Sequence, residues 1–212
     1  MPIEQRNLER FMDLARVKCT GASDAGIKAE LFEVLREFFN DSNAWQTSVA
    51  FSTVAGQTNY VVSPGSEGQV LRLAGVLDSN LVPQAALMPD IGTIVLQSAP
   101  NTVQAMTAYF VKTVDLPTIG KGYPLVPDAL FKKYFSPVLD GVLGHLMSQQ
   151  NKSYSDAKMA NYHLARYRTG IAKARVETQR ANTSGAGSWR FPQTFASRGQ
   201  RGGISVGNPA GF

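Results

Sequence analysis

The stretch "SDAGIKAELFEVLREFFNDSNAWQTSVAFSTVAG", residues 23–56, decides the fold, because the period of its apolar residues changes within it. Apolar side chains first recur at the spacing of an amphipathic helix, with glutamates and an arginine between them. After Trp45, the residues Val49, Phe51 and Thr53 alternate with serine and alanine, as in a half-buried strand. The chain therefore changes from helix to strand near residue 45. The helical stripe consists of Ile27, Leu31, Val34, Leu35, Phe38 and Phe39.

The segments on either side extend both patterns. "IEQRNLERFMDLARVKC", residues 3–19, predicts a first short helix with an apolar face. Between residues 47 and 114, about six β-prone runs separated by Gly, Pro, Asn and Asp predict a small antiparallel sandwich or barrel-like domain. Helical patterns return after residue 127. The sequence thus predicts an α+β fold, in which a bundle of two N-terminal and two or three C-terminal helices is interrupted by a small antiparallel β-domain.

The C-terminal helices carry clear boundary signals. Pro127 suits a first helical position, and Pro137 should break or kink the helix because it cannot donate to the carbonyl four residues before it. We expect the last helix to run from about residue 155 to 181, with Ser155 as its cap. Its inner seam has a 3-4-3-4 spacing. The seam comprises Ala157, Ala160, Leu164, Tyr167, Ile171 and Ala174.

Four segments follow from these patterns. Residues 1–44 are expected to form the N-terminal helices, 45–115 the β-rich insertion, 116–182 the C-terminal helices, and 183–212 an extended tail that binds a partner. The first three contain enough apolar residues to form cores, since 43% of the chain is hydrophobic. The tail differs from them in composition.

The charge of +5 is concentrated at the C-terminal end. Residues 1–150 hold 11 basic and 14 acidic residues, a balance of −3, whereas residues 151–212 hold 10 basic and 2 acidic, a balance of +8. Such asymmetry indicates DNA or an acidic protein surface as a neighbour, although a solvated basic helix face fits the charge equally well. The candidate contact residues on the last helix are Lys158, Arg166, Arg168, Lys173, Arg175 and Arg180.

The final stretch, "GSWRFPQTFASRGQRGGISVGNPAGF", residues 187–212, combines six glycines and two prolines with large aromatic residues. Glycine and proline keep a chain extended, and aromatic side chains are common anchors at protein interfaces. We therefore predict that this tail binds another subunit; an unanchored terminus is the alternative. The predicted contact residues are Trp189, Arg190, Phe191, Phe195, Arg198, Arg201 and Phe212.

Catalytic motifs are missing from the sequence. It has two histidines with no partner at metal-ligand spacing, a single cysteine and neither a G-x-S-x-G elbow nor a phosphate loop. We expect no enzyme activity, no cofactor and no metal. We also expect neither a membrane-spanning segment nor a signal peptide, because no long apolar run occurs.

The stretch "YPLVPDALFKKYFSPVLDGVLGHLMSQQNKSYSDAKMANYHLARYRTGIAKAR", residues 123–175, resembles the C-terminal helical pair of head-to-tail adaptor (connector) proteins of tailed bacteriophages. The shared features are a proline-led short helix, a glycine-containing helix, a short turn and a long basic helix. The preceding helix pair and β-rich insertion are similar to the adaptors of short-tailed phages. The sequence pattern covers about fifty residues, and the organisation covers most of the chain.

The resemblance implies a mechanical role in the virion. Adaptors of this type form a ring, usually twelve-fold, which is assembled in the host cytoplasm and docks beneath the portal. They form a platform for the tail nozzle or tube and often for fibres, and packaged DNA passes through their channel without sequence-specific contact. The resemblance also implies that the C-terminal tail extends along the portal or a neighbouring subunit. A nonspecific DNA-binding virion protein is the alternative, and a tail-completion factor is a third possibility.

Overall fold

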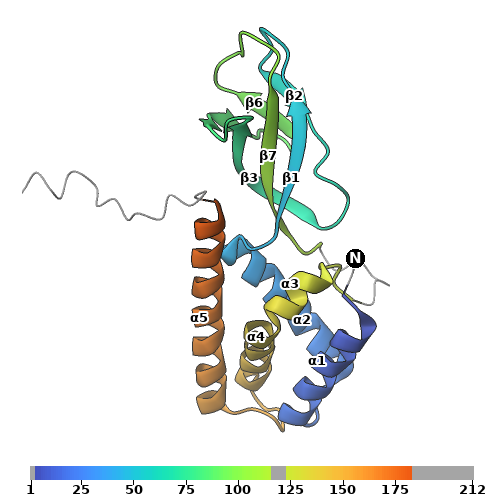
Figure 1. The fold of residues 1–212 in the computed structure, drawn as a ribbon. Helices are drawn as coiled ribbons and strands as arrows, with labels where there is room; N and C mark the ends of the chain where they lie inside the picture. Colours follow the sequence, from blue (N-terminus) through green and yellow to red (C-terminus); the bar gives the residue numbers. More distant parts are fainter. Residues whose placement is uncertain (1–2, 116–122, 183–212) are drawn as a thin grey trace, which may run out of the picture. The chain divides into compact units, whose positions relative to one another are not determined.

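The computed structural model describes residues 3–115 and 123–182. In this part of the chain the fold is α+β, as predicted: two helices, seven strands and three further helices follow one another (Figure 1). The helices are α1 (Gln5–Lys18), α2 (Asp24–Ser42), α3 (Asp128–Lys133), α4 (Phe135–Ser148) and α5 (Ala157–Asn182).

Helix α2 has the boundaries that its sequence favours. The Ser23 hydroxyl accepts a hydrogen bond from the Gly26 main-chain N–H at 3.1 Å, and Asp24 lies in the first turn, where a carboxylate complements the helix dipole. The helix ends at Asn43, which adopts the left-handed conformation with φ 57°. All six residues of the predicted apolar stripe are fully buried. This prediction is confirmed.

The break between α3 and α4 lies at Tyr134, three residues before Pro137. A proline inside a helix lacks the N–H that would bond to the carbonyl four residues back, which here belongs to Lys133, the last residue of α3. The first hydrogen bond after the break runs from the Val138 N–H to the Tyr134 carbonyl at 3.1 Å. The predicted effect of Pro137 is therefore confirmed.

Helix α5 begins at Ala157, and its cap is Asp156 rather than Ser155. The Asp156 carboxylate accepts from the main-chain N–H groups of Lys158 and Met159, each at 3.0 Å. Ser155 instead donates its hydroxyl hydrogen to the Gln149 carbonyl in the preceding turn. Ala157, at the first position of the helix, is exposed, so the buried seam begins at Ala160.

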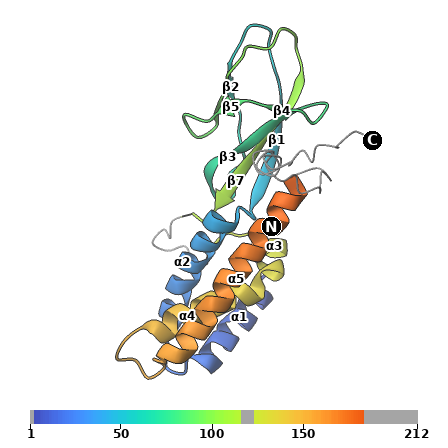
Figure 2. The same ribbon diagram turned by 90° about the vertical axis from the view of Figure 1, so that its left-hand side faces the viewer.

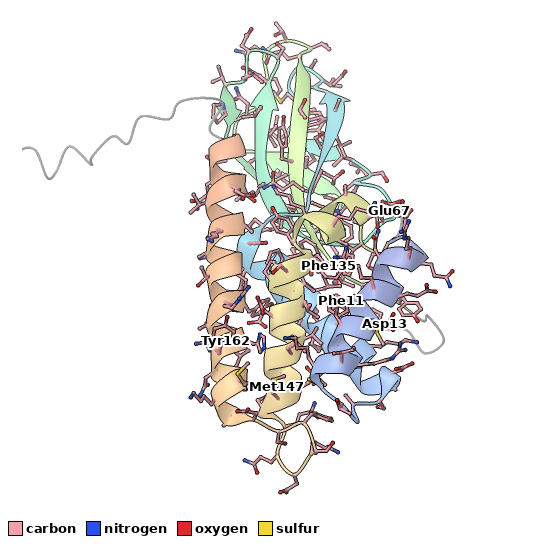
Figure 3. The ribbon with its side chains drawn as sticks, turned by 60° about the horizontal axis from the view of Figure 1, so that its bottom comes forward. Phe11, Asp13, Glu67, Phe135, Met147 and Tyr162 are labelled. Atoms are coloured by element: carbon pink, nitrogen blue, oxygen red, sulfur yellow. The ribbon has the colours of Figure 1, made fainter. Side chains whose placement is uncertain are left out.

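The helices enclose one hydrophobic core. Phe38 contacts Phe39, Tyr134 and Tyr167, with ring centroids 4.9 to 6.3 Å apart. Phe11 of α1 contacts Phe135 of α4 edge-on at 5.5 Å; both rings are labelled in Figure 3. These aromatic contacts join α1 to α4, α2 to α5, and α2 to the break between α3 and α4.

The strands form two antiparallel sheets, with orders β1-β7-β3-β4 and β2-β6-β5. Their inward side chains share a second core that includes Tyr60, Ile94 and Phe110. Two sheets with one core between them match the predicted small sandwich, and the alternating exposure along β1 matches the predicted half-buried strand. The strands are β1 (Gln46–Ser52), β2 (Asn59–Val61), β3 (Gln69–Asp78), β4 (Pro83–Gln84), β5 (Ala86–Leu87), β6 (Thr93–Leu96) and β7 (Ala105–Thr113).

Trp45 lies where the helical pattern changes to strand. Its ring packs edge-on against Phe39 of α2 at 5.5 Å and belongs to the helical core. Its main-chain carbonyl accepts from the Lys112 N–H of β7 at 2.8 Å, and Gly68 approaches the indole so closely that a Cβ there would lie 2.4 Å from Cη2. Trp45 therefore contacts both the helical core and strand β7, in the short link between the end of α2 and the start of β1.

Candidate interaction surface

A buried carboxylate holds α5 against α4. Asp140 of α4 accepts from His163 Nδ1 at 2.8 Å and from Arg166 Nε at 2.9 Å, and only 8% of Asp140 is exposed. The second nitrogen of His163, Nε2, is buried without a hydrogen-bond partner among the residues that the structure describes. The hydrogen bonds of Asp140 with His163 and Arg166 fix the position of α5 along α4 and its rotation about its own axis. Helix α4 runs beside α5 in Figure 2.

The same network orders a ring on the outer side of α5. Arg166 donates from Nη1 to the Tyr162 hydroxyl at 2.9 Å, and its guanidinium lies 5.5 Å from the centre of the Tyr162 ring. The hydrogen bond to Tyr162 and the charge of Asp140 raise the pKa of Arg166 further above its ordinary value. Tyr162 is labelled on α5 in Figure 3 and is 51% exposed.

A groove of about 740 Å³ lies beside this network, between the α3–α4 elbow and α5. Pro137 and Gly170 approach closely there, since a Cβ on Gly170 would lie 2.4 Å from the Pro137 Cβ. An ion pair of 2.8 Å between Lys133 and Glu177 also contributes to its lining. The groove is lined with apolar and charged side chains and is open to the surface.

The five described cations of the predicted contact set are all exposed. Arg166 pairs with Asp140, and Arg175 donates from Nε to the main-chain carbonyl of Asp41 at 2.8 Å, so these two contribute to packing within the chain. The side chains of Lys158, Arg168 and Lys173 make no hydrogen bond or ion pair within residues 3–115 and 123–182. The side chain of Arg180 lies outside the described residues.

A second row on α5 escaped the sequence prediction. Its members follow one another at intervals of three and four residues on the side opposite the buried seam, and all are exposed. These residues repeat with the same 3-4 period as the buried seam, so the row can be found in the sequence. We did not predict it because small residues on a basic helix do not by themselves indicate a second packing face. We call this row the outer row; it consists of Tyr162, Ala165, Thr169, Ala172 and Val176.

Helix α2 carries an acidic row at four-residue intervals: Glu33, Glu37 and Asp41. His145 of α4 lies beside it, with Nδ1 3.1 Å from Glu30 and Nε2 3.9 Å from Glu37. The hydrogen bond to Glu30 raises the pKa of His145, and that same hydrogen bond lowers the pKa of Glu30. His145 is therefore a hydrogen-bonded helix histidine.

The tail residues of the prediction lie outside the described part of the chain, so their contacts stay a prediction. They are Trp189, Arg190, Phe191, Phe195, Arg198, Arg201 and Phe212.

The described residues present neither an exposed thiol nor a metal-binding cluster. Cys19 is buried, and burial raises the pKa of its thiol. In residues 3–115 and 123–182 no group of three or more His, Cys, Asp or Glu side chains is placed to hold a metal ion. None of the helices described there is long and apolar enough to cross a membrane. The candidate site is thus a surface of cations, small residues and a groove on α5, suited to contact with another molecule.

Comparison with known proteins adds no family to this description. No protein-family model matches the chain, and no curated protein matches it.

Proposed function

We propose that this protein is a non-enzymatic head-to-tail adaptor in the neck of a tailed bacteriophage. The observation that carries the proposal is the outward surface of α5, a helix of 26 residues on which the outer row is exposed and three cations have no hydrogen bond or ion pair within the described chain. Exposed apolar side chains next to unpaired charge are typical of surfaces that become buried in an assembly.

The order of elements supports this role. The chain runs from a helix pair through a β-rich insertion to a second set of helices that ends in a long basic helix. The sequence resemblance leads us to expect this organisation. In the proposed assembly the protein forms a dodecameric ring that joins the portal to the tail nozzle or tube and lines the channel through which DNA passes. The β-rich region faces the tail of the phage and is available to the phage tail fibres. The location is the neck of the virion.

The extended tail, residues 183–212, completes the proposal. Its four aromatic residues clamp the portal or a neighbouring subunit, and Arg190, Arg198 and Arg201 pair with an acidic groove there. Truncating one aromatic hot-spot side chain should cost roughly 2 kcal/mol or more of binding free energy.

Deletion of residues 183–212 tests the clamp. The shortened protein should unfold at the same temperature as the full chain, because both described cores lie before residue 183. It should no longer co-sediment with portal-containing particles. The full chain with Ser197→Ala and Ser205→Ala, which keeps every aromatic and arginine, is the matched control. Normal incorporation of the shortened protein would contradict the clamp.

The unpaired cations favour one second candidate, a nonspecific DNA-binding virion protein. Lys158, Arg168 and Lys173 would then contact phosphates, and the affinity for a short DNA duplex should fall steeply as salt is added. A protein interface anchored by aromatic side chains should persist in the same salt. Mobility shift of a duplex at two salt concentrations, with and without Lys173→Glu, separates the two candidates.

A further inference from the structure

The outer row of α5 has the spacing of a helix-packing seam. Its members lie three and four residues apart, the arrangement by which one helix receives the ridge of another. Ala165, Thr169 and Ala172 are small and permit a close approach, while Tyr162 and Val176 supply apolar area near the ends, at 51% and 44% exposed. Arg166 contacts the Tyr162 ring, and Tyr162, Ala165 and Thr169 border the groove, but all five members of the row remain exposed among the described residues.

Cations flank the outer row on both sides. Lys173 lies on the side of the groove and Arg168 on the opposite side, and neither has a partner in residues 3–115 and 123–182. Two copies of this face would repel each other, because each would bring cations toward cations. An acidic protein surface is therefore the complement that suits the outer row and its flanking cations.

The acidic row of α2 has the required charge. Glu33 and Asp41 are exposed, and their carboxylates make no hydrogen bond or ion pair with described residues. Glu37, between them, is 48% exposed and has only a long contact of 3.4 Å to the Tyr167 hydroxyl and one of 3.9 Å to His145. Ala29 and Ala25, one and two turns before Glu33, are exposed and small enough to sit in a seam.

We propose that the outer row of α5 in one copy packs against the acidic row of α2 in a second copy. The inference deepens the proposed ring and rests on it. The two faces are different surfaces of the same chain, so the contact is head-to-tail: every copy offers both faces, and each added copy leaves one of each free. Such contacts form a closed ring when the rotation from one copy to the next closes on itself.

Two charge-reversed variants test the pairing. The α5 variant carries Lys158→Glu, Arg168→Glu and Lys173→Glu, and the α2 variant carries Glu33→Lys and Asp41→Lys. Glu37 is left intact because it contacts Tyr167 and His145. Each variant alone should lose self-association in sedimentation velocity, with a dissociation constant raised on the order of a hundredfold, since like charges then face each other.

Mixing the two variants in equal amounts should restore assembly. The reversed α5 of one variant then meets the reversed α2 of the other, and the two native faces meet at the next contact. The matched control reverses exposed cations elsewhere, Arg6→Glu, Lys18→Glu and Lys152→Glu, and should assemble like the wild type. Thermal unfolding of each variant shows that it is folded.

The possible outcomes separate a failure of the proposed face pairing from a failure of the proposed ring. Assembly of the wild type without recovery in the mixture would overturn the face assignment alone. Single variants that assemble like the wild type would overturn it as well. Wild-type protein that stays monomeric at every concentration would overturn both the ring and its faces, whereas incorporation into particles tests the tail clamp separately.

Discussion

The hydroxyl of Tyr167 on α5 donates a hydrogen bond of 2.9 Å to the main-chain carbonyl oxygen of Val34 on α2. Tyr167 is only 1% exposed, and its burial raises the pKa of the phenol well above its ordinary value. The ring packs on Gly141 of α4, where a Cβ would lie 2.9 Å from the Tyr167 Cδ2. One side chain of α5 thus connects it to two other helices, and this contact keeps the outer row facing away from the core.

Removal of the Tyr167 hydroxyl in Tyr167→Phe should lower the free energy of unfolding by about 1 kcal/mol, because a buried hydrogen bond is lost. Tyr167→Ala should lower it by about 3–5 kcal/mol through the cavity that it leaves. Urea unfolding measures both. Tyr162→Phe, on the exposed side of α5, should change stability by less than about 0.5 kcal/mol. Equal effects at the two tyrosines would contradict the assigned packing.

Asp140→Ala should destabilise the protein by about 1–3 kcal/mol, because it leaves His163 without its partner in a buried position. A double-mutant cycle with His163→Ala should give a coupling free energy above about 0.5 kcal/mol. The exposed pair between Lys133 and Glu177 is the comparison, and Glu177→Ala should cost at most about 1 kcal/mol. Additive effects at Asp140 and His163 would show that the pair does not stabilise the contact of α4 with α5.

The pair between His145 and Glu30 predicts a specific dependence of stability on pH. The folded pKa of His145 is raised from 6.5, so its contribution is complete below about 6.5 and is lost as the pH rises through the folded pKa. The folded pKa of Glu30 is lowered from 4.5, so its contribution is present above 4.5 and is lost as the pH falls through its folded pKa. The pair should contribute most between those two values.

His145→Gln should remove the alkaline part of that dependence, as measured by thermal unfolding over a pH series. Since Gln cannot titrate, the variant should lose no stability to this pair between pH of about 6 and 8. Lys152→Gln, an exposed change in the turn before α5, should keep the wild-type profile. If the stability of His145→Gln falls with rising pH as steeply as that of the wild type, another group is responsible for this pH dependence.

Gly170→Ala should destabilise the protein by about 1–3 kcal/mol, although alanine normally favours a helix over glycine. The new Cβ would lie 2.4 Å from the Pro137 Cβ, and both atoms belong to positions fixed by their helices. Gly75→Ala is the control, since no heavy atom lies within 4 Å of the Cβ that it would add. A stabilised Gly170→Ala variant would mean that α4 and α5 are less closely packed at the groove.

Much of the helical structure could be predicted because its signals are local. The stripe of α2, its Ser23 cap and the break caused by Pro137 each depend on residues within one or two turns. The cap of α5 was predicted one residue too early, because serine and aspartate are adjacent there and both are good caps. The division of the strands into two sheets depends on long-range pairing, such as β1 with β7, for which short runs carry little information.

By itself, the sequence determined the α+β class, the place near Trp45 where helix gives way to strand, and the basic character of α5, because periodicity and charge are properties of neighbouring residues. Only the tertiary structure decided which of those cations are available. Arg166 is bound by Asp140, which lies 26 residues away, and Arg175 by the carbonyl of Asp41, 134 residues away, whereas Lys158, Arg168 and Lys173 have no partner in the described chain. The physical reason is that a charged side chain is paired or hydrogen-bonded by whatever group the fold brings to within about 4 Å, regardless of its distance along the chain.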